Sequence, residues 1–76
     1  MELSIAKTLF KEGVLKEAKA TIAIEGGYNL QMIRDTIDPF PELLETTRGE
    51  ARRFKTAQAV LTITNEIGFK KVTFYS

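Results

Sequence analysis

The stretch AKATIAIEGGYNLQMIR, residues 18–34, decides the fold because it has the pattern of a β-hairpin. In both arms apolar residues recur at every second position, the period of a strand that buries one face. The adjacent glycines Gly26 and Gly27 interrupt this alternation and mark the turn.

The positions of the apolar side chains predict how the two arms pair. A loop made of the glycine pair alone places the two apolar faces on opposite sides, since a one-residue slip turns every side chain over. A loop formed by residues 25–27 brings the apolar residues to one face. The predicted pairs are Ile24 with Tyr28, Ile22 with Leu30, and Ala20 with Met32. We therefore predict a three-residue loop, with a left-handed glycine and an adjacent bulge.

Two helices are predicted outside this hairpin. Residues 3–12 carry an apolar stripe at helical spacing, and Gly13 follows as a C-terminal cap. Residues 57–67 follow Thr56, a good N-cap, and end before Gly68. This second run is rich in β-branched residues and is also compatible with a strand. As a helix, its buried side consists of Val60, Leu61, Ile63, Thr64 and Ile67.

The remaining segments predict further strands. Two prolines at positions 39 and 41 indicate a connection. Residues 42–54 then form a second hairpin that turns at Arg48 and Gly49. In this hairpin Leu43 faces Phe54 and Glu45 faces Arg52, although residues 50–54 are also compatible with an extended lead into the helix. Residues 70–75 form a last strand, whose paired lysines suit a sheet edge.

The order of elements is α-β-β-β-β-α-β in a single domain of residues 1–76. We therefore expect an α+β fold. Its sheet is mostly antiparallel, with 4–5 strands and two helices on one face.

The composition excludes several classes of function. The chain has 76 residues and neither cysteine nor histidine, which excludes disulfides, thiol nucleophiles and mechanisms with an imidazole base. No apolar run is long enough to span a membrane, and residues 1–4 do not resemble a signal peptide, so we expect a cytoplasmic protein. No catalytic or nucleotide-binding motif is present, so we expect no enzymatic activity and no cofactor or metal.

The charges are unevenly distributed. Residues 1–45 have a net charge of −3 and residues 46–76 a net charge of +4. The carboxylates of Asp35, Asp38, Glu42 and Glu45 lack calcium-loop spacing and indicate a solvated acidic loop.

The basic residues of the C-terminal part are candidates for a phosphate-binding patch if the last strand neighbours the second hairpin, with Phe69 and Tyr75 as exposed aromatic partners. The basic residues of this candidate patch are Arg48, Arg52, Arg53, Lys55, Lys70 and Lys71. The other interpretation is a solvated face that keeps the domain soluble.

Apolar residues on the outward face of the first hairpin predict self-association. Ala23 and Ile33 lie opposite the main apolar face, and parts of Val14 and Leu15 join them. A second copy adds core that so small a domain lacks. The alternative is that these are scattered surface residues.

The run LETTRGEARRFKTAQA, residues 44–59, resembles small plasmid and integrative-element proteins of the partition-associated, ParC-like type. The opening AKTLFKEGVL, residues 6–15, is similar to their starts. This resemblance implies a role near plasmid maintenance and transfers no functional residues.

Residues 54–56 also resemble the end of a strand in integrase arm-binding domains, which lay a three-stranded sheet in the DNA major groove. The first hairpin here lacks their strong positive charge, because residues 18–34 contain two basic residues and one acidic residue. This difference argues against the same mode of binding.

The sequence thus favours a non-enzymatic accessory binding module of a bacterial plasmid or mobile element. It would act through protein–protein contacts with an unknown partner and through homodimerisation. DNA binding by the basic patch is the alternative, and no membrane contact is expected.

Overall fold

The computed structural model describes residues 1–75 and contains two helices and five strands. The elements in chain order are α1 (Leu3–Lys11), β1 (Leu15–Ile22), β2 (Tyr28–Arg34), β3 (Pro41–Leu43), β4 (Arg53–Phe54), α2 (Ala57–Ile67) and β5 (Thr73–Tyr75). This is the predicted order of elements and confirms the α+β class.

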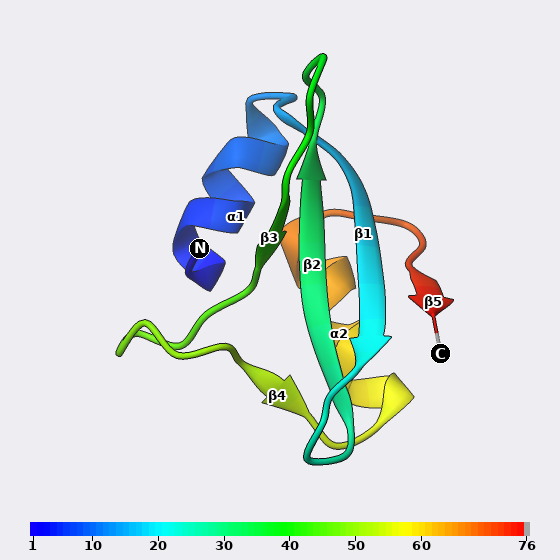
Figure 1. The fold of residues 1–76 in the computed structure, drawn as a ribbon. Helices are drawn as coiled ribbons and strands as arrows, with labels where there is room; N and C mark the ends of the chain where they lie inside the picture. Colours follow the sequence, from blue (N-terminus) through cyan, green and yellow to red (C-terminus); the bar gives the residue numbers. More distant parts are fainter. Residues whose placement is uncertain (76) are drawn as a thin grey trace.

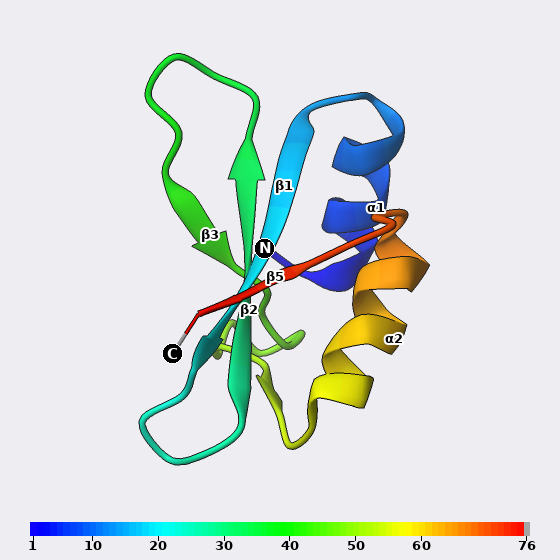
Figure 2. The ribbon, with the colours of Figure 1, turned by 90° about the vertical axis from the view of Figure 1, so that its right-hand side faces the viewer.

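The strands form one mixed sheet in the order β3-β2-β1-β5, and β4 also pairs with β2. β1, β2, β3 and β4 are joined by antiparallel pairing, whereas β5 lies parallel to β1 at the edge. Figure 1 shows the long β1–β2 hairpin at the centre, and Figure 2 shows both helices on the same side of the sheet. The sheet therefore has one face covered by helices and one open face.

The predicted register of the first hairpin is wrong by two residues. Ile22 pairs with Tyr28, Ala20 with Leu30 and Ala18 with Met32, so the loop has five residues, Ala23–Gly27. A two-residue shift leaves every side chain on its predicted face, so the alternation of apolar residues could not detect it. The bulge lies at the other end of the hairpin, where the register shifts between Leu15 and Glu17.

The shift places small side chains beneath the helices. Ala18 and Ala20 are buried there beside Leu30 and Met32, whereas Ile24 is fully exposed in the loop. At Gly27, whose φ is 74°, an added Cβ would lie 2.3 Å from the carbonyl oxygen of Phe54. Close approach of β4 to the loop therefore requires glycine at this position.

The second hairpin forms its turn as predicted but not its strand pairing. Leu43 pairs with Gln31 and Phe54 with Tyr28, so both arms extend the free edge of β2. Between them residues 44–52 leave the sheet, and Glu45 faces Ala51 rather than Arg52. The Arg52 N–H donates to the Leu44 carbonyl at 2.8 Å. The edge of β2 offers more backbone partners than an isolated two-stranded hairpin, which is marginally stable in water.

The helix α2 begins and ends where the sequence predicts. The Thr56 hydroxyl accepts a hydrogen bond from the Ala59 N–H at 3.1 Å, and Gly68 follows with a φ of 133°. Val60, Thr64 and Ile67 face the core, whereas Leu61 is exposed, contrary to prediction. Val60, Thr64 and Ile67 recur at helical spacing, and Ile63, predicted on the buried side, is partly buried and packs against the core cluster.

The outward apolar surface predicted on the first hairpin is not exposed. Ala23, Ile33 and Leu15 are all buried. Ile33 lies on a central strand between Glu17 and Pro41, and Leu15 belongs to the main core cluster. The local pattern of apolar residues does not show that Ile33 is flanked by paired residues on both sides, nor that the register shifts between Leu15 and Glu17, next to a Leu15 side chain that lies in the core.

Candidate functional site

The predicted basic patch is divided between two edges of the sheet. Arg53 lies in β4, which pairs with the outer edge of β2, and Arg48, Arg52 and Lys55 lie in the segments just before and after β4. Lys70 and Lys71 lie between α2 and β5, and β5 pairs with the outer edge of β1. The order of the sheet places β1 and β2 between the two groups. The condition for one merged patch, that the last strand neighbours the second hairpin, is therefore not met.

Two of the three arginines in the first group already have side-chain partners within the described residues. The Arg52 guanidinium lies over the Phe54 ring, 5.3 Å from its centroid. Arg53 Nη1 donates to the Glu25 carbonyl at 3.2 Å and lies 3.4 Å from the Glu25 carboxylate. Arg48 is exposed at the turn and Lys55 is exposed before α2. Two of these four cations thus contribute to the packing of the loop and of β4.

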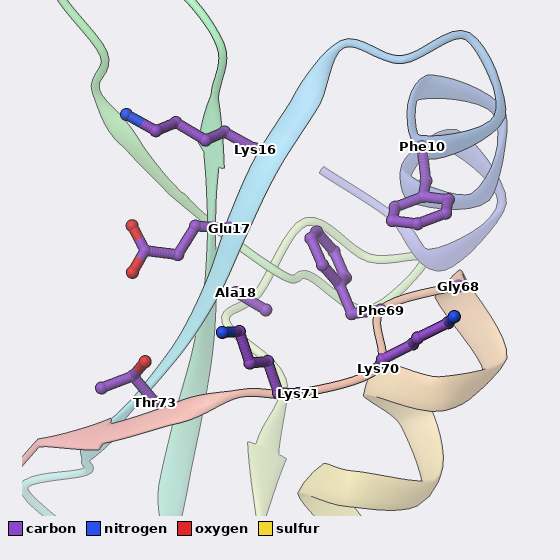
Figure 3. A pocket seen from close by; sticks show the side chains of 9 residues that line it. All are labelled: Phe10, Lys16, Glu17, Ala18, Gly68, Phe69, Lys70, Lys71 and Thr73. Carbon is purple, nitrogen blue, oxygen red and sulfur yellow. The ribbon is translucent and has the colours of Figure 1, made fainter.

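The second group borders a hollow between β1 and the crossover, which we call the lysine-rimmed groove. Its volume is about 510 Å³. Figure 3 shows Phe10 and Phe69 on its helix side, Ala18 on its floor, and Lys71 extending across it toward Ala18. The full lining is Phe10, Lys16, Glu17, Ala18, Gly68, Phe69, Lys70, Lys71 and Thr73.

The aromatic wall of this groove was not expected from the sequence. Phe69, predicted to be exposed, is 8 % exposed and packs edge-to-face on Phe10, with 4.8 Å between ring centroids. Phe74 is 40 % exposed and lies at the edge of the sheet, while Tyr75 is exposed as predicted. The run Phe69-Lys70-Lys71 directly after a helix stop was the available signal, because it places an apolar anchor beside two cations.

The connection between β2 and β3, residues 35–40, forms a second exposed feature that we call the acidic loop. It carries Asp35 and Asp38, and the side chains of Ile37 and Phe40 are 101 % and 80 % exposed. The sequence predicted that this segment connects two strands and is a solvated acidic loop, but it did not predict the exposure of Ile37 and Phe40. Whether its apolar residues are buried depends on neighbours distant in sequence, so their exposure is visible only in the structure.

An ion pair closes the base of the acidic loop. Arg34 donates to Glu42 through Nε, and through Nη2 at 3.2 Å. This hydrogen bond lowers the pKa of the Glu42 carboxyl and raises that of the Arg34 guanidinium. The Asp35 N–H also donates to the Val14 carbonyl at 2.8 Å, which joins the loop to the start of β1.

The part of the chain that the structure describes contains neither a cluster of metal-ligating side chains nor a helix that could span a membrane. Among residues 1–75, no three acidic side chains gather closely enough to hold a metal ion. Neither described helix has the length and apolar character to cross a bilayer. The lysine-rimmed groove and the acidic loop both combine charged groups with apolar side chains.

No known protein family, curated protein or solved structure matches this chain.

Proposed function

We propose that this protein is a non-enzymatic accessory binding module that acts through protein–protein contacts and forms a homodimer. The observation that carries the proposal is the exposure of Ile37 and Phe40 on the acidic loop. Isolated surface apolar residues are ordinary, but two large side chains that protrude from one short loop are typical of interface anchors. The resemblance of residues 44–59 to partition-associated proteins supports a setting on a plasmid or mobile element.

The loop is constrained in a way that favours binding. Pro39 and Pro41 restrict the backbone on both sides of Phe40, and the Arg34–Glu42 ion pair closes the base. A loop held in one conformation loses less entropy when it binds. Its apolar side chains are therefore presented to a partner at a reduced cost.

Sedimentation velocity over a concentration series tests this proposal. We expect the wild-type protein to dimerise and an Ile37→Ser/Phe40→Ser variant to be monomeric. The control is Ile24→Ser, which changes an equally exposed isoleucine on a different loop and should leave the dimer intact. A wild-type protein that stays monomeric at every concentration would refute homodimerisation.

DNA binding by the basic residues is the alternative outcome, and the same sample tests it. Because the six residues lie in two groups, we expect no salt-sensitive binding to generic duplex DNA in fluorescence anisotropy. Binding that weakens steeply with salt and disappears in an Arg52→Ala/Arg53→Ala variant would replace our proposal. Circular dichroism must then show that this variant is folded, since both arginines also contact neighbouring residues.

A further inference from the structure

The lysine-rimmed groove combines an apolar interior with an excess of positive charge. Phe10, Phe69 and Ala18 form its apolar part. Its lining contains three lysines and one carboxylate, that of Glu17. Figure 3 shows the Lys16 and Glu17 side chains on the opposite side of β1 from the aromatic pair, so Lys70 and Lys71 are the cations on the aromatic side. Within residues 1–75, Lys16, Lys70 and Lys71 form no ion pair. A segment that carries both apolar side chains and negative charge would complement the apolar interior and the positive charge of the groove.

The acidic loop has this composition. Asp35 and Asp38 accompany Ile37 and Phe40, and neither aspartate forms an ion pair within the described residues. A phenylalanine side chain is small relative to a hollow of about 510 Å³, so the groove can accept Phe40 together with part of the adjacent chain. The loop and the groove of the same chain are thus complementary in charge and in apolar character.

The loop does not occupy the groove of its own molecule. Figure 2 shows it leaving the β2 end on the side away from the helices, whereas the groove opens toward the ends of α1 and α2. The exposure of Ile37 and Phe40 also leaves both side chains free of contacts that would bury them. The loop and the groove of one molecule therefore do not contact each other, so a contact between them would join two molecules.

We propose that the acidic loop of one copy occupies the lysine-rimmed groove of a second copy. This inference rests on the proposed homodimerisation and identifies the surfaces that produce it. In a twofold arrangement the two molecules exchange loops, so each contact is made twice and the buried area doubles. Phe40 then packs near Phe10 and Phe69, while the two aspartates approach the lysine ammonium groups.

Charge reversal tests this pairing directly. The groove variant is Lys70→Glu/Lys71→Glu, and the loop variant is Asp35→Lys/Asp38→Lys. Each variant alone brings like charges together, and we expect its dimer dissociation constant to rise at least about 100-fold. An equimolar mixture joins an acidic loop to a basic groove and a basic loop to an acidic groove. The mixture should therefore regain the wild-type dissociation constant as a heterodimer.

The matched control is Arg48→Glu/Lys55→Glu, which reverses two exposed charges outside the groove and should remain dimeric. Sedimentation velocity with one variant fluorescently labelled distinguishes the heterodimer from each homodimer, and circular dichroism checks folding. If a variant does not fold, Lys71→Glu alone replaces the groove variant and Asp38→Lys the loop variant.

The outcomes separate this inference from the proposed function. A wild-type dimer that neither charge reversal weakens would refute the loop–groove contact and leave homodimerisation standing. Two monomeric variants that do not associate when mixed would refute it as well. A monomeric wild-type protein would refute homodimerisation and the contact together.

Discussion

At the scale of single residues, the ion pair between Arg34 and Glu42 links the end of β2 to the middle of β3. Both side chains are partly exposed, so solvent screens the interaction and its contribution to stability is modest. Its position matters more than its strength, because it closes the base of the acidic loop. The pair therefore couples the shape of that loop to the ionisation of one carboxyl group.

We predict that Glu42→Gln lowers the melting temperature by a few degrees at neutral pH. The pKa of Glu42 in the folded protein lies below the reference value of 4.5, so the pair stabilises the fold above that value. This stabilisation is lost as the pH falls through the lower, folded-state pKa. Melting curves should therefore show a difference between wild type and variant at neutral pH that disappears in acid, once the pH is below the folded-state pKa of Glu42.

The control is Glu50→Gln, because Glu50 is exposed and forms no ion pair within residues 1–75. Its melting temperature should equal that of the wild type at both pH values. A difference for Glu42→Gln that persists unchanged in acid would contradict an electrostatic origin.

At the scale of elements, the register of the β1–β2 hairpin decides which side chains form the core. The pairing of Ala20 with Leu30 buries Leu30 completely, whereas Ile24 is fully exposed in the loop. The register predicted from the sequence would instead pair Ile24 with Tyr28 on the buried face. In the predicted register Ile24 would contribute to the free energy of unfolding as a core residue, whereas in the observed register it contributes little.

We predict that Leu30→Ala lowers the free energy of unfolding by about 2–5 kcal/mol, because it opens a cavity in the core. Ile24→Ala should change it by no more than about 0.5 kcal/mol, as expected for an exposed site. Urea unfolding of the two variants measures both values. A loss of several kcal/mol for Ile24→Ala would show that the hairpin has the three-residue loop.

At the scale of the whole molecule, the order of the strands decides which surfaces exist. β5 joins β1 rather than the second hairpin, which separates Lys70 and Lys71 from Arg52 and Arg53. The same crossover passes the end of α1 and places Phe69 against Phe10, which forms the lysine-rimmed groove. One topological choice thus divides the basic patch and creates the groove.

The topology also predicts an order of local stability. β5 is three residues long, exposed throughout and paired on one side only, whereas β1 and β2 lie at the centre of the sheet. In hydrogen exchange, the amides of β5 that pair with β1 should exchange much faster than those of Ala20 and Leu30. Equal protection would show that β5 is part of the same cooperative unit as the central hairpin.

The sequence alone determined the two helices and the central hairpin, because caps, glycines and the spacing of apolar residues specify these elements locally. The Thr56 cap, the glycines at positions 13 and 68, and the alternation in residues 18–34 were sufficient to place two helices and the central hairpin. These signals act over a few residues, so tertiary context is not needed to interpret them.

Only the tertiary structure decided the register of the hairpin and which strands pair with the outer edges of β1 and β2. These pairings in turn determine which residues form the candidate site. A two-residue slip preserves the buried face, so Ile24 and Ile22 fit the pattern equally well in either register. The burial of Phe69 and Ile33, and the exposure of Ile37 and Phe40, depend on segments brought together from distant parts of the chain. Such long-range contacts are selected by the packing energy of the whole core, which no local pattern of residues encodes.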